Sequence, residues 1–194
     1  MNGKIRWCRC DTRLGPVRLA ARGGALIGLW FDGQKHDVPP GADWQQSQDD
    51  PLLNEAARQV RDYLDGRRRA FDLPLAPEGT AFQQSVWRAI AKVPVGRTAS
   101  YRDLARRIGR PSSVRAVGAA VGRNPLSVVV PCHRIVGSDG SLTGYAGGLD
   151  RKRELLALEH VALDAPREAV ALSRAGARRV RCDARTSRGS SPSP

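Results

Sequence analysis

Two helix-start signatures in the second half of the chain constrain its fold more than any other feature of the sequence. Thr80 is followed three residues later by Gln83, and Ser100 is followed at the same spacing by Asp103. In such a capping box the two side chains bond to each other's backbone amides, which otherwise lack partners at a helix start. The sequence therefore predicts one helix over TAFQQSVWRAIAKV and a second over SYRDLARRIG.

A third helix is predicted over PSSVRAVGAAVGRN, which follows the second one. Serines stand before it as N-cap candidates, and Gly122 and Asn124 near its end are residue types common at helix ends. Each glycine inside a helix costs roughly 1 kcal/mol relative to alanine, so a helix this rich in small residues needs a reason. Either it packs closely on a neighbouring helix, or it presents a flat face to a groove of DNA, with Arg115 at its first turn.

The second and third predicted helices, joined by GRPSS, have the arrangement of a helix-turn-helix. This pattern alone does not identify a DNA-binding protein, because helical hairpins that never touch DNA are common. The net charge of +13 favours a polyanionic partner, since clustered Lys and Arg gain free energy by releasing counterions from phosphates. Both interpretations of the helix pair stay open at this point.

The first part of the chain has a different pattern. KIRWCRC, GPVRLAAR and GALIGLWF, within residues 4–31, are short and partly alternating apolar runs separated by Gly and Pro, which predicts an antiparallel meander. Residues 33–50 are expected to form a polar loop. A helical stripe of apolar residues follows and ends at Gly66, and RRRAFDLPLAPEG has the composition of a linker.

These shifts divide the chain of 194 residues into an N-terminal α/β domain over 1–75, a mostly helical domain over 76–163 and a tail over 164–194. Residues 165–194 contain seven arginines and only two acidic residues, and the chain ends in TSRGSSPSP. This composition predicts a basic, disordered tail. The tail carries only part of the charge, so the folded part is basic as well.

Several classes of protein are excluded. No apolar stretch approaches the ~20 residues that a membrane helix needs, and the first ten residues lack the apolar segment of a signal peptide. Four scattered cysteines do not suggest a disulfide framework. We therefore expect a cytoplasmic protein with reduced thiols and no membrane partner, associated with the nucleoid if its source is prokaryotic.

The segment VVVPCHRIVG places Cys132 beside two basic side chains, His133 and Arg134. A free thiol has a pKa near ~8.5, so a nucleophilic cysteine needs a base or a positive environment. Neighbouring residues of an extended segment point to opposite sides, so we expect a water to link Cys132 to His133. Glu159 is a candidate to orient the histidine. The alternative is a buried cysteine that acts as a small apolar residue.

NPLSVVVPCHRIVGSDGSLTGYAGGLDRKRELLALE resembles the active-site region of the O6-alkylguanine-DNA alkyltransferases, the methylated-DNA–protein-cysteine methyltransferases, whose hallmark is a Pro-Cys-His-Arg core. The likeness extends upstream and covers about residues 80–160. It implies an α/β fold, with an N-terminal ribonuclease-H-like antiparallel sheet and helix followed by a mostly α-helical catalytic domain of winged or helix-turn-helix type.

The resemblance also implies residue roles. Cys132 corresponds to the alkyl acceptor, His133 to the water-linked base and Glu159 to its orienter. Asn124 holds the segment before the cysteine, and Tyr101 helps to rotate the nucleotide and donates a hydrogen bond to guanine. Arg115 is the finger that fills the base stack. The other expected DNA contacts are Ser113, Ala116, Gly118, Ala119, Arg123 and Arg134, and the expected pocket residues are Tyr145, Ala146, Gly147, Gly148, Val130 and Pro131.

The implied activity is DNA repair without a cofactor. The alkyl group of O6-alkylguanine, with O4-alkylthymine left open, passes irreversibly to Cys132 after the base is flipped out of double-stranded DNA. We expect a monomer and leave cooperative binding along DNA open. Two rivals share features with it: a non-catalytic DNA-binding relative would lack the acceptor thiol, and a Cys-His-Glu hydrolase would need an oxyanion hole and turnover.

No metal site is expected. Cys8 and Cys10 form C-x-C and could bind zinc together with His36, as N-terminal Cys and His residues do in some relatives. The ligand pattern of those relatives is not reproduced here, and we expect the two thiols to point to opposite faces of their strand. Trp87 has helical spacing from Val86 and Ile90, which is typical of a core residue.

Overall fold

The computed structural model describes residues 3–161. The predicted tail over 164–194, with Cys182, lies outside the described residues. Within the described part, no helix combines the length and the apolar character that crossing a bilayer requires.

The N-terminal sheet is the predicted meander with one addition. β1 (Arg6–Cys10), β2 (Val17–Arg22) and β3 (Ala25–Phe31) pair antiparallel. The expectation of a plain loop over 33–50 is wrong in one detail, because β4 (Gln45–Gln46) pairs parallel with β1 and gives the order β3-β2-β1-β4. A strand of two exposed polar residues carries no alternating apolar pattern, so the sequence gives no signal for it.

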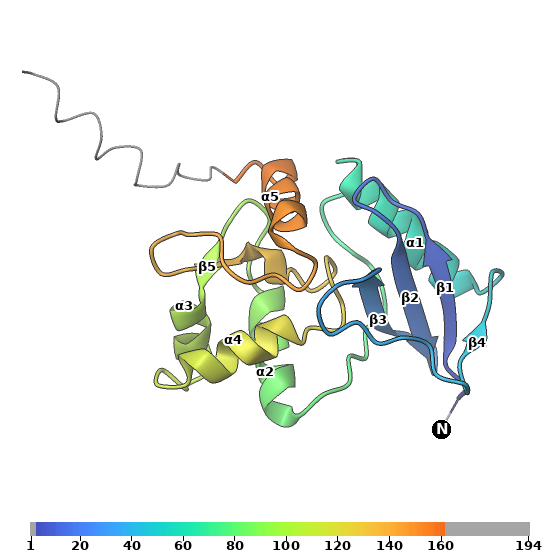
Figure 1. Cartoon of the computed structure of the whole chain (residues 1–194), viewed down its shortest axis with the longest axis horizontal. Coiled ribbons are helices and arrows are strands. Elements are labelled where there is room, and N and C mark those ends of the chain that lie inside the picture. The colour runs from blue at the N-terminus through green and yellow to red at the C-terminus, as the bar shows by residue number, and fades with distance from the viewer. Residues whose placement is uncertain (1–2, 162–194) are drawn as a thin grey trace, which may run out of the picture. The chain divides into compact units, whose positions relative to one another are not determined.

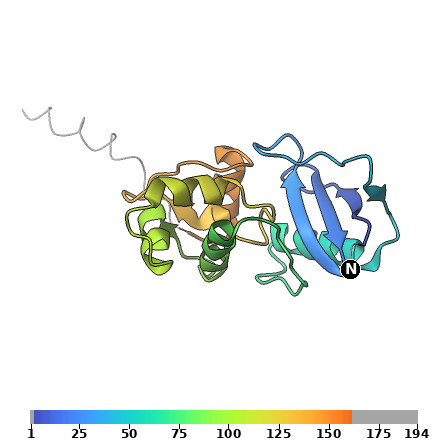
Figure 2. The same ribbon diagram turned by 90° about the horizontal axis from the view of Figure 1, so that it is seen from below.

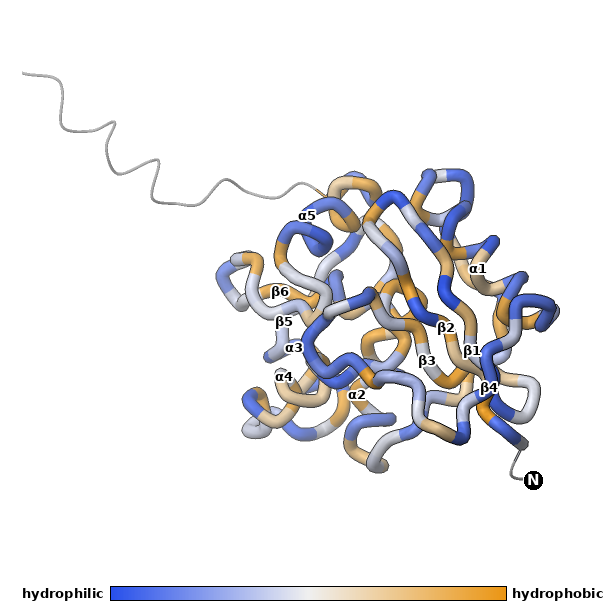
Figure 3. The backbone as a smooth tube through the Cα atoms, turned by 45° about the vertical axis from the view of Figure 1, so that its right-hand side comes forward, coloured by the Kyte–Doolittle hydropathy of each residue, from blue (hydrophilic) through white to orange (hydrophobic). Residues whose placement is uncertain are grey.

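Helix α1 (Pro51–Leu64) covers one face of this sheet (Figures 1 and 2). It begins at Asp50, whose side chain accepts a hydrogen bond from the Leu53 amide at 3.0 Å. Its buried stripe, including Leu53, Val60 and Leu64, is the one that the sequence predicts. In Figure 3 hydrophobic stretches lie mainly where strands and helices face each other, and hydrophilic ones lie mainly in the outer loops.

The expected placement of the two N-terminal thiols is wrong. Cys8 and Cys10 are both buried in the same core cluster, because residues two apart in a strand share a face. The Cys10 sulfur accepts a hydrogen bond from Arg61 at 3.0 Å, and burial raises the pKa of both thiols, that of Cys8 to about 11. Over residues 3–161 no group of three His, Cys, Asp or Glu side chains is placed to hold a metal.

The second half is mostly helical, as predicted. Both capping boxes form: the Gln83 amide donates to Thr80 at 3.2 Å, the Thr80 amide donates to Gln83 at 2.8 Å, and Ser100 and Asp103 repeat the pattern. The elements are α2 (Ala81–Ala91), β5 (Ala99–Ser100), α3 (Tyr101–Arg107), α4 (Val114–Gly122), the 3-10 turn η1 (Cys132–Arg134), β6 (Ile135–Val136) and α5 (Leu149–Leu158).

Helix α4 uses its two faces differently. Val117, Ala120 and Val121 are buried, and the Trp87 indole of α2 donates to the Ala120 carbonyl at 2.9 Å, so Trp87 belongs to the core as predicted. The small residues on the other face stay open to solvent. The expected serine cap is absent, since Ser113 at the N-cap makes no side-chain cap hydrogen bond.

Strand β3 holds the segment that leads to Cys132. The Leu29 amide donates to the Pro125 carbonyl at 2.8 Å, and the Ser127 amide donates to the Leu29 carbonyl at 2.9 Å. The buried Gln34 side chain accepts from the Ser127 hydroxyl at 3.0 Å. The N-terminal sheet therefore fixes the backbone from which the Cys132 thiol projects.

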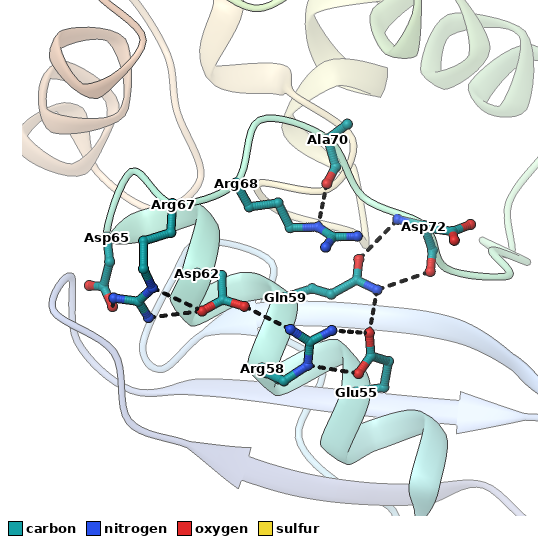
Figure 4. Close-up of polar contacts among 9 residues, drawn as sticks. All are labelled: Glu55, Arg58, Gln59, Asp62, Asp65, Arg67, Arg68, Ala70 and Asp72. Carbon is teal, nitrogen blue, oxygen red and sulfur yellow. Dashed lines mark hydrogen bonds and ion pairs between the residues drawn. The ribbon is translucent and has the colours of Figure 1, made fainter.

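A buried glutamine on α1 anchors the linker, as Figure 4 shows. The Gln59 amide donates to the Asp72 carbonyl at 3.0 Å and accepts from the Asp72 amide at 2.9 Å. An exposed ion-pair network surrounds it, in which Arg58 binds Glu55 and Asp62. Water screens such surface pairs, so the buried amide contributes more to stability.

Gln59→Leu should lower the free energy of unfolding by about 1–2 kcal/mol. The substitution removes both hydrogen bonds between the Gln59 side chain and the Asp72 backbone, which are partly buried. Urea denaturation measures this change. The matched control Arg58→Ala removes exposed ion pairs from the adjacent position and should leave the urea midpoint close to that of the unmodified chain. An equal loss in both variants would contradict the anchoring role of Gln59.

Candidate active site

Two tight turns present Cys132 to its surroundings. Val128 has a φ of 70°, a conformation that β-branched residues rarely adopt, and it forms the centre of a three-residue turn. Pro131, with φ −79° and ψ 63°, forms a second such turn, which the Cys132 amide closes by donating to the Val130 carbonyl at 2.8 Å. The proline ring holds φ near the value that this turn needs.

The extended backbone expected around Cys132 and His133 is wrong, because these residues and Arg134 form one turn of 3-10 helix. The turn at Pro131 reverses the chain direction and leads directly into it. Both side chains are fully enclosed: Cys132 is 3% exposed and His133 is 0% exposed. The thiol is therefore sheltered from bulk water at rest.

Asn124 contacts the sulfur directly. Its amide nitrogen lies 3.1 Å from the Cys132 sulfur and 2.8 Å from the Val130 carbonyl, to which it donates, while its oxygen accepts from the Leu126 amide at 3.1 Å. Asn124 is itself buried. The side chain thus holds the turn before Cys132 and places a hydrogen-bond donor against the thiol.

A buried carboxylate holds the histidine. Nε2 of His133 lies 2.8 Å from Oε1 of Glu159, and because a carboxylate only accepts, Nε2 carries the hydrogen. Among the described residues Nδ1 of His133 has no protein hydrogen-bond partner, so it is an acceptor free for a proton. This arrangement is the one that a base acting through Nδ1 requires.

Arg134 occupies a different place from the one expected. Its guanidinium lies 2.9 Å from both oxygens of Glu159 and donates to the Val93 carbonyl at 2.6 Å. It is only 6% exposed. The expected DNA contact by Arg134 is therefore wrong: a buried carboxylate needs a cation beside it, and Arg134 supplies that charge.

Burial and pairing set the pKa values of these groups. Burial lowers the pKa of His133, against the opposing effect of its bond to Glu159, so the imidazole is neutral at rest. Burial also raises the pKa of Cys132, while the Asn124 amide and the charge of Lys152 act to lower it. For Glu159 the bonds from His133 and Arg134 outweigh burial and lower the pKa to about 2.

Two residues of the site escape prediction from the sequence. Lys152 is fully buried, donates to the carbonyls of Ile135 and Thr143 at 2.5 and 2.6 Å, and has its pKa lowered to about 8 by burial. The charged run RKRE around it is typical of a solvated helix face, so the sequence gives no sign that Lys152 is buried. Tyr63 on α1 donates to Glu159, and no local pattern connects residues so far apart in sequence.

A pocket of about 370 Å³ brings together several of the expected residues. The Tyr101 hydroxyl, at its edge, donates to the Thr143 and Gly144 carbonyls at 3.2 Å. Lys35 and His36 of the N-terminal part also line it, without having been expected there. The remaining lining residues are Tyr101, Gly118, Ala119, Gly122, Arg123, Gly144, Tyr145 and Ala146.

Four expected pocket residues lie elsewhere. Val130 lines a separate cavity of about 700 Å³ beside α2. Gly147 is buried, and a Cβ there would lie 2.7 Å from the Tyr145 ring, so only glycine fits. Gly148, with a φ of 91°, is the N-cap of α5, and Pro131 is buried in its turn.

The outward face of α4 is open to solvent. Arg115, Ala116, Ala119 and Arg123 are exposed, and Ser113 and Gly118 are partly exposed. Four of these six expected contacts lie on the helix, and the other two, Ser113 and Arg123, are its N-cap and its C-cap. The arrangement combines small side chains with two cations, which suits close approach to a phosphate backbone.

Comparison with known proteins places this geometry in context. Residues 5–77 match the family described as 6-O-methylguanine DNA methyltransferase, ribonuclease-like domain, and residues 81–161 match the 6-O-methylguanine DNA methyltransferase, DNA binding domain. A methylated-DNA–protein-cysteine methyltransferase of Methanosarcina barkeri is 47% identical over 77% of this chain and 93% of its own length. The protein of that name from Mycobacterium tuberculosis is 42% identical over 80% of this chain and 92% of its own.

A solved structure gives the same likeness. The crystal structure of Mycobacterium tuberculosis OGT in complex with DNA superposes with a TM-score of 0.73 and 41% sequence identity. The match covers 79% of this chain and 92% of the other chain. The α/β sheet followed by a helical domain is thus shared along almost the whole of that structure.

Glu159→Gln should destabilise the fold at neutral pH by about 3–5 kcal/mol, since it leaves the Arg134 charge buried without a counterion. The folded-state pKa of Glu159 is depressed from 4.5 to about 2. Its contribution is therefore complete above pH 4.5 and is lost as the pH falls towards 2. The stability of the variant should fall less over this range than that of the unmodified chain.

Urea unfolding between pH 2.5 and 7 measures both effects. The control Glu55→Gln removes an exposed carboxylate whose pKa is also lowered, to about 2, by hydrogen bonds from Arg58 and Gln59. Because water screens that site, the neutral-pH midpoint of the control should stay near that of the unmodified chain. A neutral-pH loss as large in Glu55→Gln as in Glu159→Gln would contradict the assignment to the buried pair.

Proposed function

The chain belongs to the 6-O-methylguanine DNA methyltransferase family, and from this premise we propose that it repairs O6-alkylguanine in double-stranded DNA by taking the alkyl group onto Cys132. The observation that carries the proposal is the enclosed Cys132 thiol, which touches Asn124 and adjoins a His133–Glu159 pair. DNA is the partner in the similar mycobacterial complex.

In the proposed step a bond forms between the Cys132 sulfur and the alkyl carbon, and the bond from that carbon to O6 breaks. The thiol proton passes through a water to Nδ1 of His133, and the departing guanine anion takes up a proton from water. His133 then releases its added proton to water, so atoms and charge balance. Glu159 holds the tautomer in which Nδ1 can accept. The Asn124 amide and the Lys152 charge favour the thiolate as it forms.

The damaged base must leave the duplex to reach an enclosed sulfur, at a cost of a few kcal/mol. We propose that contacts of α4 with DNA compensate for this cost. Arg115 fills the gap in the base stack, and the small outward residues allow close contact. Tyr101 is assigned to turn the nucleotide and to donate to guanine, and Tyr145 and Ala146 to form a wall of the pocket. These roles rest on the family resemblance and on the positions of the residues.

The product is a thioether, which is a poor leaving group. Each chain therefore acts once and needs no cofactor for the transfer. A Cys-His-Glu hydrolase would require turnover, and a DNA-binding relative without chemistry would not need the acceptor thiol. We further infer action by a monomer in the cytoplasm, with the choice between O6-alkylguanine and O4-alkylthymine left to experiment.

Mixing the protein with excess methylated duplex should give one burst of repair equal to the amount of active protein and no turnover afterwards. Intact-mass analysis and peptide mapping should find one added methyl group on the peptide containing VVVPCHR. Cys132→Ser should bind the lesion without becoming methylated, whereas the control Cys8→Ala should give the full burst. Repair beyond one methyl group per chain, or a methyl group on Cys8 or Cys10, contradicts the proposal.

Arg115→Ala should slow repair of a duplex roughly tenfold or more, because no side chain then fills the gap that the flipped base leaves in the stack. Reaction with free O6-benzylguanine needs no flipping and should be nearly unchanged. The control Arg58→Ala removes the same charge from an exposed site on α1 and should affect neither substrate strongly. Single-turnover rates with both substrates measure this difference. An equal loss of rate with the duplex and with free O6-benzylguanine in the Arg115 variant would refute the finger role.

A further inference from the structure

A tyrosine from the N-terminal half reaches the catalytic carboxylate. Tyr63 lies in the last turn of α1 and its hydroxyl donates to Oε1 of Glu159. The side chain is 2% exposed, and its ring packs on Phe71 with ring centres 5.0 Å apart. A buried phenol needs such a partner, but this partner is the group that orients the proposed base.

The oxygen that Tyr63 binds is the one that His133 shares. Oε1 accepts from Tyr63, from His133 at 2.8 Å and from Arg134 at 2.9 Å, and Oε2 accepts from Arg134 and from the Gly96 amide at 3.3 Å. Each donor stabilises the ionised carboxylate and weakens its pull on the other donors. The Tyr63 hydroxyl therefore competes with His133 for the same negative charge.

We propose that Tyr63 is a positioning residue for alkyl transfer, which sets the basicity of His133 by sharing Oε1 of Glu159. The proposal rests on the proposed function, because it concerns the histidine that takes the thiol proton. During transfer His133 becomes positively charged, and the charge on Glu159 determines how stable that imidazolium is. A residue of α1 thereby influences the reactivity of a cysteine held by a distant part of the chain.

The other charged and titratable groups around His133 and Glu159 do not change when Tyr63 is substituted. Cys132, Arg134, Tyr145 and Lys152 surround His133, and all four are unchanged by a substitution at Tyr63. Glu159 and Tyr63 also line a cavity of about 240 Å³ with Arg68, Arg69 and His160. The positive groups near Glu159 favour its ionised form, so removing one neutral donor changes its strength as an acceptor without protonating it at neutral pH.

Tyr63→Phe removes the hydroxyl and keeps the ring. Without this competitor Glu159 stabilises the His133 imidazolium more strongly, and proton transfer from Cys132 becomes easier. Because His133 must be neutral to accept the thiol proton and its pKa is now higher, the pH midpoint of the single-turnover rate should move up by about half a unit. The plateau rate should fall by roughly threefold to tenfold, because the carboxylate loses one of the bonds that fix its orientation.

The experiment uses the full chain and free O6-benzylguanine, so that DNA binding does not enter. Single-turnover rates of benzyl transfer are measured from pH 5.5 to 9.5 for the unmodified chain, for Tyr63→Phe and for the matched control Phe71→Leu, together with urea midpoints. Phe71→Leu removes the ring packed on Tyr63 but leaves its hydroxyl in place. It should lower stability without moving the pH midpoint.

A second variant keeps the test informative if Tyr63→Phe does not fold. Site-specific 3,5-difluorotyrosine at position 63 makes the phenol a stronger donor, which lowers the pKa of His133, and the pH midpoint should then move down. Opposite shifts, or the upward shift in Tyr63→Phe alone, support the proposal. Unchanged midpoints, or the same shift in Phe71→Leu as in Tyr63→Phe, overturn it. Absence of benzyl transfer in the unmodified chain instead refutes the proposed function itself.

Discussion

The buried carboxylate of Glu159 is the interaction on which the rest of the site depends. An ionised group so far from water is tolerated only when charges and hydrogen-bond donors surround it. Here Arg134, His133, Tyr63 and the Gly96 amide meet that demand, and they come from different segments of the chain. Satisfying one charge therefore brings α1, the end of α5 and the turn after Cys132 together.

Cys132 and His133 are both uncharged before the reaction, and they become charged only when the thiol proton is transferred. At rest burial keeps Cys132 protonated and His133 neutral, and the charges that act on them within residues 3–161 are those of Glu159, Arg134 and Lys152. In the proposed step, transfer of the thiol proton creates a cation beside Glu159 and an anion beside Asn124. The partners for both charges are already in position, so little reorganisation is needed when the charges form.

The sequence predicts what depends on neighbours along the chain and misses what depends on distance. Capping boxes and the stripe of α1 involve residues three or four apart, and they are confirmed. The Tyr63–Glu159 bond joins residues 96 positions apart, which no local pattern reveals. Arg134 was expected at DNA because its charge is visible in the sequence, whereas its buried counterion is not.

The N-terminal half supports the acceptor site through two separate anchors. Backbone bonds from Leu29 hold the segment before Cys132, and the Tyr63 hydroxyl holds the carboxylate behind His133. The first anchor sets where the sulfur lies, and the second acts on the group that we propose takes its proton. Because the two anchors come from a strand and a helix packed on each other, a shift of that pair would change both the position and the reactivity of the thiol. The sheet and its helix are therefore part of the proposed chemistry, and not only a platform beside a DNA-binding domain.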